Sequence, residues 1–131
     1  MKINKEKIKE MNPEKAEIIL LYLGALNELF NEFKDMPIQD LTGYDSENKF
    51  TQQGICKELD FKYQIYFNSI SGINRFKPNY LNKIINFINV ITASYGSFSE
   101  FIIKGIINTY KPEKYHFELN NILISNMQKP D

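Results

Sequence analysis

Apolar residues recur along most of the chain at the three- and four-residue spacing of an α-helix. The longest such pattern follows Asn12 and Pro13, which suit a helix N-cap and a first helical position, and it continues to about Lys34. Its apolar positions are Ile19, Leu23, Leu26, Phe30 and Phe33, widened by Leu20, Leu21 and Leu29. The pattern predicts a helix over residues 13–34 that is buried on more than one side.

Shorter helical patterns follow a loop. Residues 35–49 contain Pro, Gly and several small polar residues, a composition typical of a loop. Helices are predicted over residues 51–59, 62–71 and 79–94. Gly72 is expected to end the second of these helices in a left-handed conformation.

The last third of the chain is less regular. Ser97 and Glu100 form a capping box, which predicts a further helix to about Thr109. Residues 113–131 carry the patterns of both a strand and a helix, so the structure of this tail stays open.

These patterns together predict an all-α protein of five or six helices. A length of 131 residues suits a single domain over residues 1–131. The core is expected to form around the two longest helices, with Leu23, Leu26, Phe30, Ile55, Leu59, Ile84, Ile88 and Phe101 among its members.

Composition excludes several classes of protein. Hydrophobic residues make up 43% of the chain, which is too many for a disordered protein. No apolar run approaches the ~20 residues of a membrane span, and the charged N-terminus does not suit a signal peptide. The single cysteine cannot form an internal disulfide, so we expect a cytoplasmic protein. One His and one Cys exclude the usual Cys/His zinc site, and we expect neither a metal nor a cofactor.

Charge is balanced overall but unevenly distributed. Residues 51–87 hold five basic and two acidic residues, a net charge of +3, so an anionic partner is expected there. Residues 28–50 hold six acidic residues and two lysines, a net charge of −4. The many Ile and Asn residues and the single Arg indicate an AT-rich genome, such as that of a low-GC bacterium or a mobile element.

The stretch from Thr51 to Gly72 has the layout of a helix-turn-helix. A small residue, Cys56, stands in the first helix where the two helices would cross. Apolar residues are placed to hold the second helix against the first, namely Ile55, Leu59, Phe61, Tyr66 and Ile70. The second helix then leaves Lys62, Tyr63, Gln64, Phe67 and Asn68 to face a groove. Lysine meets phosphates, whereas Gln and Asn pair bidentately with adenine.

With these residues the chain resembles the lambda-repressor-like (Xre-type) helix-turn-helix family over residues 51–102. The resemblance is carried by Thr51, Gln52, Ile55, Cys56, Leu59, Gly72, Pro78, Leu81, Lys83, Ile84 and the segment 95–102. Asp60 departs from it, because glycine is usual in the turn, and Lys62 replaces the usual Ser or Thr cap. The segment before Thr51 is predicted to be a loop, so the helix at 13–34 would have to replace the family's first helix.

The resemblance implies a small DNA-binding transcription regulator, usually a dimer on a palindromic site. Its residues at the DNA groove would be Gln52, Lys62, Tyr63, Gln64 and Asn68, with Arg75 and Lys77 near the DNA backbone. The alternative is a protein-binding module or inhibitor of phage or mobile-element type. It would act through the acidic surface of residues 28–50, with Asp40 and Asp45 as contacts.

No residue pattern indicates an enzyme. His116 lies between two aromatic residues with no nucleophile pattern beside it. Cys56 has no cationic group arranged to lower its pKa, so a core position is expected for it.

Overall fold

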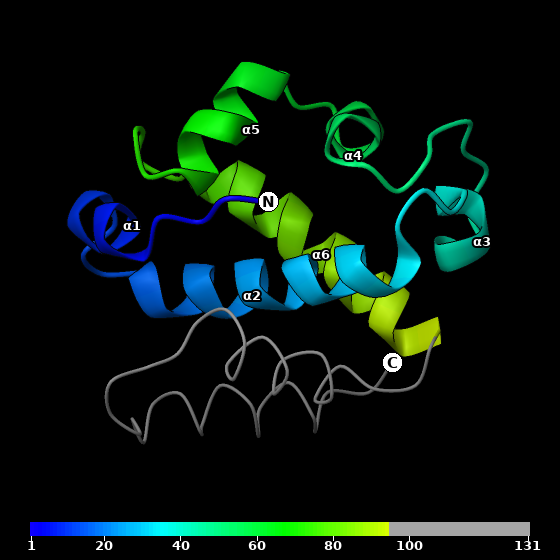
Figure 1. Cartoon of the computed structure of the whole chain (residues 1–131), viewed down its shortest axis with the longest axis horizontal. Helices are drawn as coiled ribbons and strands as arrows, with labels where there is room; N and C mark the ends of the chain where they lie inside the picture. The colour runs from blue at the N-terminus through cyan, green and yellow to red at the C-terminus, as the bar shows by residue number, and fades with distance from the viewer. Residues whose placement is uncertain (95–131) are drawn as a thin grey trace.

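The computed structural model describes residues 1–94, which form α-helices joined by short connections. They are α1 (Lys5–Met11), α2 (Ala16–Phe33), α3 (Ile38–Thr42), α4 (Gln52–Glu58), α5 (Tyr63–Ile70) and α6 (Pro78–Ser94). Figure 1 shows α2 and α6 crossing in the middle, α1 and α3 at opposite ends, and α4 and α5 along one edge. The predicted all-α fold is confirmed. None of the helices in this part of the chain is long and apolar enough to cross a membrane.

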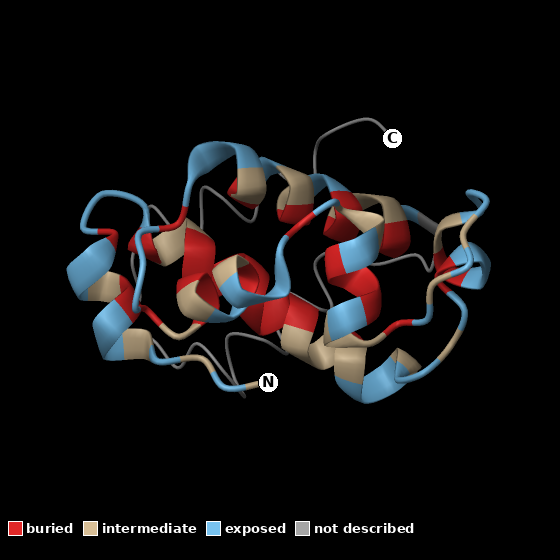
Figure 2. Cartoon of the chain, turned by 90° about the horizontal axis from the view of Figure 1, so that it is seen from above, coloured by how far each residue is buried: buried red, intermediate tan, exposed pale blue. Residues whose placement is uncertain are grey.

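The core forms around α2, which is buried along most of its length. Every residue from Ile19 to Leu26 is buried, and both α1 and α6 pack against this helix. Near its C-terminal end, the ring of Phe30 lies 4.8 Å from that of Phe50, which lies 6.2 Å from the ring of Phe87 in α6. Buried positions gather toward the middle of the molecule in Figure 2. The expectation of a helix buried on more than one side is therefore confirmed.

Most of the expected core residues are buried. The fully buried ones are Leu23, Leu26, Ile55, Ile84 and Ile88, whereas Phe30 and Leu59 are half-buried against the core. Phe101, the capping box at Ser97 and Glu100, His116 and the tail at 113–131 lie outside the described residues.

The N-terminal end of the long helix differs from the sequence prediction. Asn12 is not its N-cap: it is the C-cap of α1, and α2 begins only at Ala16. The buried side chain of Asn12 donates to the backbone oxygen of Ile8 (3.0 Å) and accepts from the backbone N–H of Phe76 (2.8 Å). Asn12 thus joins α1 to a loop far along the chain, a contact that a local cap pattern does not reveal.

Residues 35–49 are not all loop, as the sequence indicated, because α3 lies within them. Backbone hydrogen bonds between its two ends close the segment at its base. The N–H of Asp35 donates to the oxygen of Phe50 (3.1 Å), and the N–H of Phe50 donates to the oxygen of Met36 (2.7 Å). Leu41 in α3 is fully buried, and α3 packs against α6. Tertiary burial therefore stabilises a helix too short for its pattern to be recognised.

Gly72 ends α5 in the predicted left-handed conformation, with a φ of +76°. A Cβ at this position would lie 2.4 Å from the Cβ of Lys7 and 2.8 Å from the backbone nitrogen of Ile8. The loop after α5 therefore packs against α1 too closely for any residue larger than glycine.

We expect Gly72→Ala to lower the free energy of unfolding by about 3 kcal/mol, because it adds both left-handed strain and a clash with α1. Gly43→Ala is the matched control, since Gly43 has a φ of +78° but no atom within 4 Å of an added Cβ. That variant should lose only about 1–2 kcal/mol. Urea denaturation followed by circular dichroism measures both values. Equal losses would contradict the close packing of the loop on α1.

Candidate nucleic-acid interface

The helices α4 and α5 form a unit joined by a short turn of residues 59–62. The Thr51 side chain caps α4 by accepting from the backbone N–H of Gly54 at 2.9 Å, as expected for a Thr that opens a helix. The two helices cross steeply, since α4 is seen almost end-on in Figure 1 and α5 from the side. The two helices expected in this stretch are therefore present and lie in contact.

The turn contains a residue in the left-handed conformation. Asp60 has a φ of +56°, a region that non-glycine residues rarely adopt and that Asp tolerates better than most. Asp60 is the position at which the sequence departs from the helix-turn-helix family, where glycine is usual. The backbone of Asp60 thus adopts a conformation that glycine adopts more easily, although Asp60 carries a side chain.

Lys83 of α6 holds this turn in place. Its Nζ donates to the backbone oxygen of Leu59, the C-cap of α4, at 3.0 Å. It also lies 5.8 Å from the ring centroids of both Phe61 and Tyr80, whose rings are 4.4 Å apart. A cation at a helix C-terminus and over aromatic faces is stabilising on both counts. No local sequence pattern indicates this role of Lys83, because its partners Leu59 and Phe61 lie on other elements.

A hydrogen bond between side chains joins the two helices directly. The hydroxyl of Tyr66 in α5 donates to Oε1 of Gln52 in α4 at 3.0 Å. Gln52 is half-buried, and this hydrogen bond directs its carbonyl oxygen toward α5. Of the residues predicted to lie at the groove, Gln52 is thus the one that links the two helices.

The outer face of α5 carries most of the other predicted contact residues. Lys62, Tyr63 and Gln64 are exposed at its beginning, and Asn68 is half-buried one turn further on. Nε2 of Gln64 donates to Oδ1 of Asn68 at 2.9 Å, which links the two amides on one face. Phe67 lies on the same face, with an exposed fraction of 42%.

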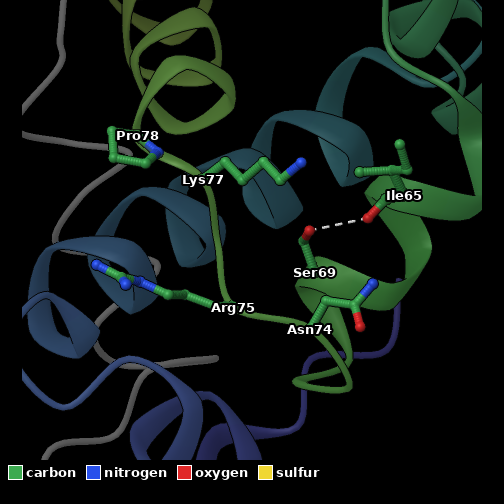
Figure 3. Close-up of a pocket in the computed structure, with 6 residues that line it drawn as sticks. All are labelled: Ile65, Ser69, Asn74, Arg75, Lys77 and Pro78. Atoms are coloured by element: carbon green, nitrogen blue, oxygen red, sulfur yellow. Dashed lines mark hydrogen bonds between the residues drawn. The ribbon is translucent and has the colours of Figure 1, made fainter.

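A groove of about 480 Å³ lies beside α5. It is lined by Ile65, Ser69, Asn74, Arg75, Lys77 and Pro78. Figure 3 shows Lys77 extending across it toward α5, whereas Arg75 points away from α5. The side chains of Lys77 and Arg75 therefore point in different directions, although the sequence led us to expect both near the DNA backbone.

Two titratable side chains, Cys56 and Tyr66, are buried inside the unit. Burial raises the pKa of the Cys56 thiol to about 11. Burial also raises the pKa of Tyr66, and the neighbouring Cys56 and Tyr63 raise it further. Both side chains are neutral near pH 7, and a neutral thiol is a poor nucleophile.

The acidic segment lies at the end of the molecule that holds α3. Asp40 and Asp45 are exposed, and Tyr44 beside them has an exposed fraction of 65%. The loop between α3 and α4 is held by Oε1 of Glu58, which accepts from the side chains of Ser46 (2.5 Å) and Asn48 (2.9 Å).

Comparisons of the chain with protein-family models, curated proteins and solved structures found no match. The function is therefore inferred from the chain's own residues and their arrangement.

Because Asp60 has a left-handed backbone, the free energy of unfolding should depend on which residue occupies this position. We expect Asp60→Gly to raise the free energy of unfolding by up to about 1 kcal/mol, because glycine adopts this conformation without strain. Asp60→Val should lower it by about 1–2 kcal/mol, because a β-branched side chain is strained at positive φ. Urea denaturation of both variants checks this order. A Val variant as stable as the wild type would contradict the left-handed turn.

Proposed function

We propose that the protein is a small, non-enzymatic DNA-binding regulator that places α5 in the major groove of duplex DNA. The proposal rests on the outer face of α5, where Tyr63, Gln64, Phe67 and Asn68 are presented together. The major groove admits an α-helix, and amide side chains hydrogen-bond base edges there. The steep crossing of α4 and α5 supports the same mode of docking, in which the second helix enters the groove.

Charge near α5 supports contact with the phosphates. Lys62 stands at the N-terminus of α5, and Lys77 reaches toward the helix from the loop beside it. Cations on the borders of a groove-binding helix meet the DNA backbone and fix the position of the helix. We further propose a homodimer on a palindromic site, as the resemblance to the helix-turn-helix family implies.

Phosphate contacts are tested by the salt dependence of binding. We expect Lys62→Gln and Lys77→Gln each to reduce the slope of log K against log salt by about one unit, because each removes one phosphate contact. Arg75→Gln is the matched control, with the same charge change in the same loop but a side chain that points away from α5. Its slope should equal that of the wild type. Fluorescence anisotropy with labelled duplexes, including the gene's own upstream region, measures the three slopes.

Two results would count against these assignments. No binding of any duplex at low salt would contradict the proposed function. An equal loss of slope in all three variants would contradict the separate roles of Lys77 and Arg75.

A different surface favours a second candidate function, which is protein binding. Tyr44 is the most exposed of the large apolar side chains in the described part of the chain, at 65%, and Asp45 follows it directly. Glu58 holds this loop in place through the hydrogen bonds of Ser46 and Asn48. An exposed aromatic on a fixed loop is a typical anchor of a protein interface, and the acidic residues around it suit a basic partner.

If this loop binds a protein, Asp45→Lys should weaken the complex about tenfold or more, because it places like charges opposite each other. Glu14→Lys is the control, since Glu14 is an exposed acid before α2. A pull-down identifies the partner and calorimetry measures both affinities. Equal affinities of the two variants would contradict binding at this loop.

A further inference from the structure

We infer that α5 selects A·T base pairs, with Gln64 and Asn68 reading adenine as a linked pair and Phe67 and Tyr63 packing against thymine methyl groups. This inference rests on the proposed function. It adds the class of DNA sequence that the helix recognises.

The composition of α5 excludes the usual readers of G·C pairs. The helix is YQIYFNSI and contains no Arg, Lys, Asp or Glu. Arg and Lys bind O6 and N7 of guanine, and acidic side chains accept from N4 of cytosine. The nearest cation, Lys62, precedes the first turn of α5, a position suited to a phosphate.

The hydrogen bond between Gln64 and Asn68 leaves one amide oxygen and one amide nitrogen of the pair without a role in it. Because Nε2 of Gln64 donates to Oδ1 of Asn68 at 2.9 Å, Oε1 of Gln64 remains an acceptor and Nδ2 of Asn68 remains a donor. Adenine presents the complementary pair in the major groove, the N6 donor and the N7 acceptor. Guanine presents two acceptors there, so it offers no donor to the oxygen of Gln64.

The hydrogen bond between the two amides also reduces the entropic cost of binding a base. Two amide side chains that already orient each other lose less rotamer freedom when they meet a base. The pair is therefore expected to act as one reading unit, in which the loss of either amide removes most of the preference for adenine.

The exposed aromatic side chains of α5 match the other half of an A·T pair. Tyr63 and Phe67 have exposed fractions of 41% and 42%, and they stand four positions apart, on one face of the helix. The C5-methyl of thymine is the apolar group that the major groove offers, and aromatic side chains contact it. Packing these rings against the thymine methyl removes apolar surface from water. A G·C pair has no methyl group at this place.

The first experiment changes the DNA and leaves the protein intact. The full chain selects duplexes from a random library, and the selected duplex is then remade with uracil in place of thymine or 7-deazaadenine in place of adenine. Uracil lacks the methyl group and 7-deazaadenine lacks the N7 acceptor. We expect A·T pairs to be enriched, uracil to weaken binding about fourfold for each contacted methyl, and 7-deazaadenine to weaken it about tenfold.

Two variants assign these effects to side chains. Phe67→Ala is expected to reduce the effect of uracil, since Tyr63 keeps its own methyl contact, and to leave that of 7-deazaadenine unchanged. Ile73→Ala is the control, because Ile73 is an exposed apolar residue beyond the end of α5, with an exposed fraction of 52%. It should keep both effects.

The outcomes separate this inference from the function on which it rests. Enrichment of A·T pairs with both base-analogue effects supports the inference. Binding with no preference for A·T pairs, or binding unchanged by both analogues, overturns the inference and leaves the proposed function standing. No binding to any duplex overturns both.

Discussion

The arrangement of the described helices depends on covering α2. Eight consecutive residues from Ile19 to Leu26 are buried, so this helix cannot face water on any side in that region. α6 packs against α2, and other residues of α6 contact the turn between α4 and α5: Lys83 donates to the oxygen of Leu59, and the ring of Tyr80 packs against that of Phe61. The burial of α2 thereby positions α6, and α6 in turn positions the α4–α5 unit that carries the candidate interface.

The two faces of α5 differ in their contacts: the inner face holds the helix in the fold, and the outer face is exposed. The bonds that hold the helix come from its inner residues, such as the Tyr66 hydroxyl to Gln52 and the Ser69 hydroxyl to the backbone of Ile65. The outer residues Gln64 and Asn68 bond only to each other among the hydrogen bonds described for their side chains. Substitutions on the outer face can therefore be made without removing the contacts that stabilise the fold.

Sequence patterns predicted those features that depend on local spacing. The periodicity of α2, α5 and α6 and the left-handed Gly72 follow from neighbouring residues, and so does the exposed face of α5. α1 was missed because Ile8 is its one buried residue, and α3 because it is only one turn long. The roles of Asn12 and Lys83 depend on partners elsewhere in the fold, which no local pattern contains. The sequence likewise could not show that the side chains of Lys77 and Arg75 point in different directions relative to α5.

The contact between Asn12 and Phe76 has a consequence for the order of folding. It joins residues 64 positions apart, and closing a loop of this length costs more entropy than any contact within the unit of α4 and α5. Helix pairs with local contacts form early, and distant contacts form late. During synthesis α1 emerges long before the loop that it packs against. The loop that carries Arg75 and Lys77 is therefore expected to reach its final shape only when α1 docks, near the end of folding.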